Sequence, residues 1–123
     1  MNSLGDVMVV GLTGQTGAGK STVSKVFRQC GFALIDADHI SREVVKKGSK
    51  CLHEIEDCFP ENVIAEDGTL NRKELAKIVF SDSKKKELLN SIMYPYIMGY
   101  ILQEIHRYAD SGQKMILLDA PTL

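Results

Sequence analysis

The residues most able to do chemistry lie in a glycine-rich segment near the N-terminus. The eight residues Gly14–Ser21 follow the pattern GxxxxGK[ST] at every fixed position. Glycines let successive backbone N–H groups turn inward around phosphate oxygens, because they have no Cβ to clash. The lysine of this pattern reaches the β- and γ-phosphates, and the hydroxyl after it binds Mg²⁺. The segment therefore predicts a site for the phosphates of a nucleoside triphosphate, which we take to be ATP, with magnesium.

The motif assigns contacts residue by residue. Lys20 would hold the phosphates and is a catalytic candidate, and Ser21 would bind magnesium. A helix beginning near Lys20 would add the positive end of its dipole. No third glycine follows Gly19, so the dinucleotide pattern GxGxxG is absent and a dehydrogenase is disfavoured. The predicted nucleotide-binding residues are Gly14, Thr16, Gly17, Ala18, Gly19, Lys20, Ser21 and Thr22.

Two aspartates, Asp36 and Asp38, lie just beyond the apolar run 32–35. In an open α/β sheet the carboxyl ends of the strands face the ligand crevice, so both would lie near the nucleotide. Phosphoryl transfer to a hydroxyl needs a carboxylate that orients the hydroxyl and accepts its proton. Either aspartate could do this, while the other supports magnesium through water. The alternative for Asp38 is a structural one, as the N-cap of a helix containing Ile40.

Three further polar residues are candidates with weaker patterns. Asp119 follows the apolar run 115–118, the arrangement of an aspartate that holds magnesium, although an ordinary polar strand end has the same pattern. Arg42 and Arg72 could bind a phosphate-rich acceptor, because a guanidinium group binds phosphate through two hydrogen bonds. The alternative for each arginine is a plain surface position.

The strands that would position these residues are short apolar runs. Residues 7–12 and 32–35 read as buried strands, and the helical pattern between them ends at Gly31. This is a βαβ unit, whose two strands must be parallel. Residues 114–118 read as a third strand.

The long segment between the second and third strands reads as helical. Asp67-Gly68 marks a turn within it, and Asn71 with Glu74 has the form of a capping box. The last helix is predicted to be kinked or broken at Pro95. The predicted helical segments start at Ile40 and end near Gly48, run over 52–59 before Pro60, run from Asn71 through Val79, and extend from Ser83 to Ser111-Gly112.

Composition sets the broad class. The chain has 123 residues, is 44% hydrophobic and carries a formal net charge of -1, which favours one modest soluble domain and gives no electrostatic case for binding nucleic acid or membranes. Its three cysteines form no CxxC pair and read as reduced structural residues. No signal-peptide pattern precedes the first strand, so we expect a cytoplasmic protein.

Taken together, these residues resemble one family closely, the dephospho-coenzyme A kinases. The third of the four segments that carry the resemblance is the most specific, because other P-loop kinases have no reason to share it. The segments are Val10–Gly14 leading into the phosphate loop; Asp36–Asp38 with Arg42–Val45; Asp67–Arg72 with Leu75 and Val79-Phe80; and Leu89-Asn90 with Pro95 and Ile97.

The resemblance implies a P-loop NTPase fold, an α/β/α three-layer core around a parallel sheet with an inserted helical acceptor-binding region. It divides the chain into core residues 1–47, acceptor-binding residues 48–110 and a third core strand within 111–123. It also implies ATP-dependent phosphorylation of the ribose 3′-hydroxyl of dephospho-coenzyme A with Mg²⁺. Asp38 matches the family's catalytic aspartate and Asp36 is its neighbour.

Two departures from the family accompany this resemblance. Tyr94 stands where the family usually has a histidine near the acceptor, and it is the corresponding candidate contact here. Members of the family are also longer, so we expect the later strands and the lid to be missing and a sheet edge to be exposed, which could allow a homo-oligomer. The alternatives are another small-molecule or nucleotide kinase of the P-loop class, or a silent nucleotide-binding fragment.

Overall fold

The computed structural model describes residues 7–13, 19–60 and 62–120. The predicted α/β class is confirmed, and each of the three predicted strands is found within one residue of its expected ends. The elements are β1 (Met8–Leu12), α1 (Lys20–Gln29), β2 (Ala33–Asp36), α2 (Ala37–Glu43), α3 (Lys50–Cys58), α4 (Arg72–Ser81), α5 (Ser83–Asp110) and β3 (Met115–Asp119).

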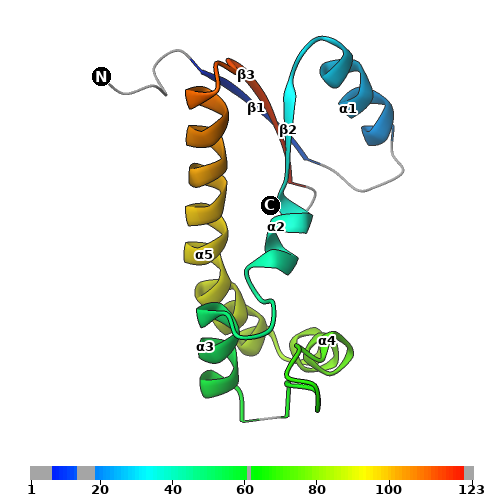
Figure 1. The fold of residues 1–123 in the computed structure, drawn as a ribbon. Coiled ribbons are helices and arrows are strands. Elements are labelled where there is room, and N and C mark those ends of the chain that lie inside the picture. Colours follow the sequence, from blue (N-terminus) through cyan, green and yellow to red (C-terminus); the bar gives the residue numbers. More distant parts are fainter. Residues whose placement is uncertain (1–6, 14–18, 61, 121–123) are drawn as a thin grey trace. The chain divides into compact units, whose positions relative to one another are not determined.

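The three strands form one parallel sheet, and the last strand in the chain is the central one, in the order β1-β3-β2. Ile116 and Leu117 are both 0% exposed. Successive strand residues point to opposite faces, so both faces of β3 are covered. Figure 1 shows α1 on one side of the sheet and the C-terminal part of α5 on the other. The predicted three-layer core is therefore confirmed.

Strand β1 forms an edge of the sheet within the described residues. Its first residues, Met8 and Val9, are 56% and 43% exposed. On α1, Val23 and Val26 are exposed as well. Exposed apolar side chains beside an unpaired strand edge are the features that invite association with another surface. The homo-oligomer predicted from this edge stays a prediction.

The chain divides into two compact units. The sheet unit comprises residues 1–40 and 99–123, and the helical unit comprises residues 41–98. The division expected from the sequence, with an acceptor-binding region at 48–110, concerns function and stays a prediction. Each unit is described below by itself.

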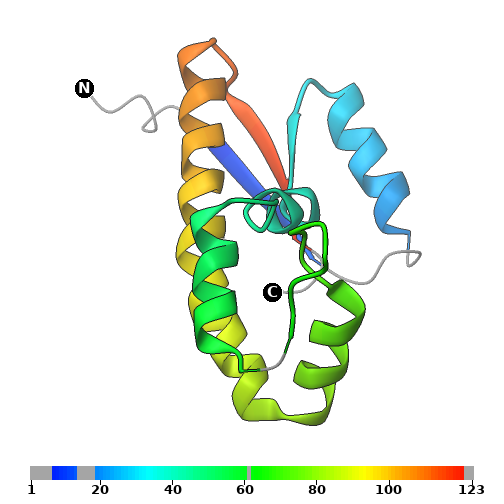
Figure 2. The same cartoon turned by 60° about the horizontal axis from the view of Figure 1, so that its bottom comes forward.

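The helical unit is organised around a small hairpin between α3 and α4 (Figure 2). Ile64 and Leu70 form an antiparallel bridge, and Gly68 turns the chain with a φ of 88° that favours glycine. The Oδ1 atom of Asn71 accepts a hydrogen bond from the backbone N–H of Glu74, so the predicted cap of α4 is confirmed. The backbone N–H of Asn71 itself donates to the carbonyl of Val63 rather than to Glu74, which ties the helix start to the hairpin.

Helix α5 runs through Pro95 as one helix of 28 residues. Of the predicted kink or break at Pro95, the break is therefore wrong, and the kink stays a prediction. Proline removes one backbone donor from the helix, but packing on both sides of it maintains the helical path: Ile92 is buried before it, and Ile101 and Ile105 are buried after it. Burial of an apolar face here outweighs the local preference of one residue.

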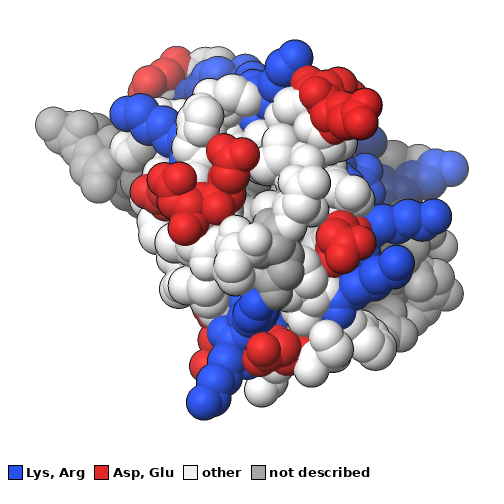
Figure 3. Space-filling view, turned by 90° about the horizontal axis from the view of Figure 1, so that it is seen from below, with Lys and Arg blue, Asp and Glu red and all other residues white. Residues whose placement is uncertain are grey.

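One face of the molecule shows no dominant charge. The face in Figure 3, seen from below relative to Figure 1, carries acidic and basic side chains interspersed around uncharged ones. Within the described residues, no helix is both long and apolar enough to cross a membrane.

Candidate active site

The carboxyl ends of the three strands are level with one another. Asp119, the last residue of β3, pairs in register with Leu12 of β1 and with Asp36 of β2. The backbone N–H of Ala120 donates to the carbonyl of Leu12 over 2.9 Å and fixes this edge just before the phosphate-loop segment. Asp36 and Asp119, far apart in sequence, are thus paired residues on adjacent strands.

Helix α1 begins at Lys20, directly after Gly19. Gly19 is its N-cap, with φ of 81°, a left-handed conformation that glycine adopts without steric cost. Glycine has no side chain with which to cap the first helical amides, so this helix start is suited to bind an anion. Ser21 and Thr22 lie in the first turn of α1. The predicted contacts Gly14, Thr16, Gly17 and Ala18 lie outside the described residues, as do the side chains of Lys20 and Ser21.

Asp36 and Asp38 are both exposed but have different local roles. The Oδ1 atom of Asp36 accepts hydrogen bonds from the backbone N–H groups of Asp38 at 3.0 Å and His39 at 3.4 Å. Asp36 therefore caps α2, whose first residue is Ala37. The alternative of Asp38 as the N-cap is wrong, because α2 begins at Ala37 and already contains Asp38. Asp38 lies within the first turn.

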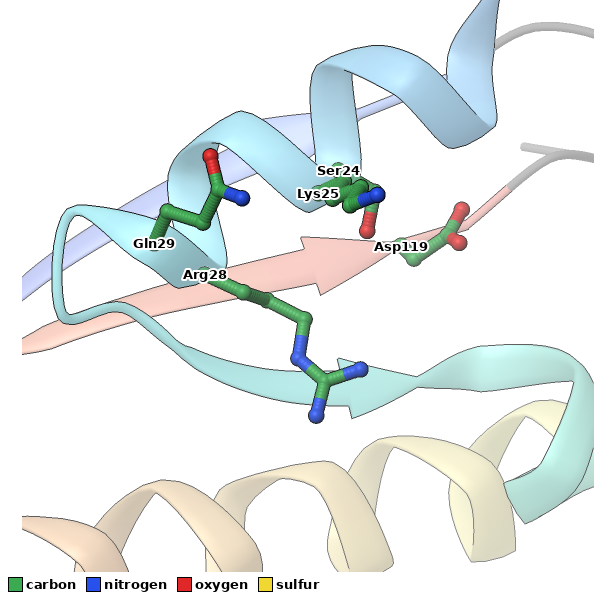
Figure 4. A pocket seen from close by; sticks show the side chains of 5 residues that line it. All are labelled: Ser24, Lys25, Arg28, Gln29 and Asp119. Carbon is green, nitrogen blue, oxygen red and sulfur yellow. The ribbon is translucent and has the colours of Figure 1, made fainter.

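Asp119 lines a cavity of about 490 Å³ with side chains from α1. Figure 4 shows these side chains along the helix and Asp119 at the end of β3. Lys25 and Arg28 place two cations in the lining, and the sequence reasoning missed both. Their spacing of three residues, on a helix that starts at the phosphate loop, was the available signal, because residues three apart share a helix face. The other lining residues are Ser24 and Gln29.

The donor set at this edge fits magnesium in a phosphate complex. In the part of the chain that the structure describes, no three or more His, Cys, Asp or Glu side chains are grouped so that they could hold a metal ion by themselves. Mg²⁺ in phosphate-transfer sites needs no such cluster, because it keeps several waters and takes one or two protein oxygens together with phosphate oxygens. Asp119 provides one suitable carboxylate, half-buried, with its Oδ1 atom shielded from solvent.

The remaining candidates belong to the helical unit. Arg42 lies in the last turn of α2, and Arg72 is the first residue of α4; both are exposed. Tyr94 on α5 is 50% exposed. The buried Cys51 is no nucleophile, because burial, with the charge of Glu54 as a smaller cause, raises the pKa of its thiol to about 11.

Comparison with known proteins identifies a family. The profile of the dephospho-CoA kinases matches residues 8–123. The dephospho-CoA kinase of Clostridium tetani is 46% identical over 120 residues, which cover 97% of this chain and 53% of that protein. The enzyme of that name from Listeria innocua is 45% identical over 114 residues, which cover 93% of this chain and 57% of the relative.

A solved structure is similar as well. The crystal structure of a Thermus thermophilus protein superposes with a TM-score of 0.74 at 30% sequence identity, covering 94% of this chain and 56% of that one. This similarity supports the arrangement of strands and helices described above. The chain spans about half the length of the curated relatives it matches.

Proposed function

Because the chain belongs to the dephospho-CoA kinase family, we propose that its protein transfers the γ-phosphoryl group of ATP to the 3′-hydroxyl of dephospho-CoA, giving coenzyme A and ADP. The observation that carries this proposal is the level carboxyl edge of the sheet, where Asp36 and Asp119 lie on adjacent strands. The start of α1, which is capped only by Gly19, lies in the same sheet unit and supports the binding of the phosphates there.

Asp38 is the proposed general base. The oxygen of the 3′-hydroxyl forms a bond to the γ-phosphorus, the bond from that phosphorus to the bridging oxygen breaks, and Asp38 accepts the hydroxyl proton. Asp36 supports this role through structure, since its carboxylate holds the backbone of Asp38 in place by a 3.0 Å hydrogen bond. A base fixed at its main chain loses less conformational freedom when the acceptor arrives.

Lys20 is proposed to contact the β- and γ-phosphates, alongside the backbone amides of Gly14, Thr16, Gly17, Ala18, Gly19, Ser21 and Thr22. Ser21 and Asp119 would hold Mg²⁺, which when bound neutralises charge that develops on the phosphate oxygens. Arg42, Arg72 and Tyr94 are the proposed contacts of the acceptor. We place the reaction in the cytoplasm, and propose that any homo-oligomer would form through the exposed edge of β1.

The test is a comparison of acceptors at equal concentration. The protein is incubated with ATP, Mg²⁺ and either dephospho-CoA, AMP or shikimate, and the phosphorylated products are separated by chromatography and weighed by mass spectrometry. We expect coenzyme A as the main product. Faster transfer to AMP or shikimate would indicate a different small-molecule kinase. Tight ATP binding without transfer to any acceptor would indicate a nucleotide-binding module.

A further inference from the structure

The cavity beside α1 has an excess of positive charge that the proposed reaction does not use (Figure 4). Among the described residues that line it, Lys25 and Arg28 are two cations and Asp119 is one carboxylate, so these three groups carry a net charge of +1. Neither cation forms a salt bridge with a described residue. Their charges are therefore available to an anion from solution.

The two cations lie beyond the helix start that the nucleotide phosphates would occupy. Helix α1 begins at Lys20, so Lys25 and Arg28 lie about 7.5 Å and about 12 Å further along its axis, at a rise of about 1.5 Å per residue. The backbone amides of a helix start hold a phosphate at the first turn. A ligand that contacts Arg28 therefore occupies a second position, further along α1.

Helical spacing directs four polar side chains of α1 into this one cavity. Ser24 and Arg28 are four residues apart, as are Lys25 and Gln29, and residues at this spacing share a helix face. The hydroxyl and the amide place neutral hydrogen-bonding groups beside the two cations. The described lining contains no apolar side chain, so it favours an oxygen-rich anion over an apolar ligand.

The spacing of the cations and the volume of the cavity favour two linked phosphates over one. A guanidinium group binds one phosphate through two hydrogen bonds, and an ammonium group binds another as a point charge. Side chains three residues apart start from Cβ atoms about 5–6 Å from each other, so Lys25 and Arg28 can reach adjacent phosphates of one ligand. The volume of about 490 Å³ lies in the range of about 300–1,000 Å³ that holds a complete small ligand.

We propose that the cavity beside α1 is a second anion site, which binds a diphosphate group through Lys25 and Arg28. Inorganic pyrophosphate and the diphosphate of a larger metabolite share this chemistry. Asp119 lies in the same lining, so an anion in this site adjoins the carboxyl edge of the sheet. The inference goes beyond the proposed function, because the site is assigned neither to the nucleotide at the phosphate loop nor to the acceptor.

Calorimetry with pyrophosphate tests the inference. The protein is first saturated with ADP to occupy the phosphate loop, and Mg²⁺ is left out because it would complex the probe. We expect one pyrophosphate to bind per chain, about tenfold more tightly than inorganic phosphate. A parallel titration with UDP-glucose separates the two sources: tighter binding of UDP-glucose assigns the site to a substituted diphosphate, and tighter binding of pyrophosphate assigns it to the free anion.

Single alanine variants locate the bound pyrophosphate. Arg28→Ala should weaken its binding by about tenfold or more, because two hydrogen bonds to one phosphate are lost. Lys25→Ala should weaken it by about tenfold, to the affinity of inorganic phosphate. Both residues are exposed on a helix, where alanine is well tolerated. Lys114→Ala is the matched control, because it removes the same charge from an exposed position of the sheet unit outside the described lining, and it should change the affinity by less than about twofold.

Three results would overturn the inference. The first is an ADP-saturated protein that binds no pyrophosphate, and the second is an unchanged affinity in both Lys25→Ala and Arg28→Ala. The third is an equal loss in Lys114→Ala, which would show that the net charge of the protein attracts the anion without a site. None of these results bears on transfer to dephospho-CoA, which the comparison of acceptors tests separately.

Discussion

The sheet unit and the helical unit bring their important side chains together by different means. In the sheet unit the backbone positions the side chains, because parallel register alone makes Asp36 and Asp119 neighbours. In the helical unit side-chain packing positions them, around a core in which Ile55 is 0% exposed and Val63 is 1% exposed. The sheet unit also leaves apolar residues at the surface, among them Val26 at 52% exposure.

This difference indicates where each unit tolerates change. A site placed by strand register depends on few specific side chains beyond those that do the chemistry. A site placed by packing depends on the volume of every residue beneath it. Substitutions in the sheet unit should therefore alter turnover more than stability, and core substitutions in the helical unit should alter stability first.

The largest effect is expected from the proposed base. Asp38→Asn should lower turnover of dephospho-CoA by about 10²–10⁴-fold, the usual contribution of a general base, with little change in melting temperature. Asp36→Asn should lower it far less, because asparagine still caps α2. Steady-state kinetics with dephospho-CoA compare the turnover of the two variants. Equal losses would show that the two carboxylates share the role.

A core substitution in the helical unit should have the next largest effect. Ile55→Ala removes a fully buried side chain and should lower the free energy of unfolding by about 2–5 kcal/mol. Val26→Ala in the sheet unit should change it by less than about 0.5 kcal/mol, because Val26 is half exposed. Urea denaturation followed by circular dichroism measures both. A large cost for Val26→Ala would mean that another surface covers α1.

Loss of the cap on α2 should cost less than loss of the core residue. Asp36→Ala removes the acceptor for two backbone amides and should destabilise the protein by about 0.5–2 kcal/mol. Asp36→Asn should retain most of that stability. Thermal melts of the two variants under identical conditions separate capping from charge, and the same destabilisation in both would assign the effect to the charge of Asp36.

The smallest effect concerns the hairpin. The Thr69 hydroxyl donates to Asp67 at 2.6 Å and is the largest cause that holds the pKa of this carboxyl below its ordinary value. Thr69→Val should raise the pKa of Asp67, which NMR titration would detect. A carboxyl with a lowered folded-state pKa stabilises the fold above its unfolded pKa and loses that contribution as pH falls through the folded pKa. Thr69→Val should therefore slightly lower the free energy of unfolding at neutral pH but not in acid. An unchanged pKa of Asp67 in the variant would contradict this prediction.

Local patterns predicted the elements well, because the strands are short apolar runs bounded by glycine or aspartate. They did not predict the strand order. A βαβ pattern shows that β1 and β2 are parallel, but nothing within residues 7–36 shows that β3 inserts between them. They also assigned the cap of α2 to the wrong aspartate, because apolar periodicity marks where a helix is buried rather than where it begins.

The remaining site features depend on contacts between distant segments. Lys25 and Arg28 join Asp119 only when α1 packs beside β3. No single stretch of sequence contains this arrangement. The roles of Lys20, Asp38 and Tyr94 stay predictions.

The central position of β3 also governs how the sheet can fold. Within the described residues, β1 and β2 are not neighbours, and each pairs only with β3, at residues 115–119. Bringing Met8 to Met115 closes a loop that contains nearly the whole described chain, and this loss of chain entropy precedes the first ladder hydrogen bond. The helical unit closes within residues 41–98. On a ribosome, the carboxyl edge proposed to receive the nucleotide would thus be assembled after the helices that precede β3 in the chain.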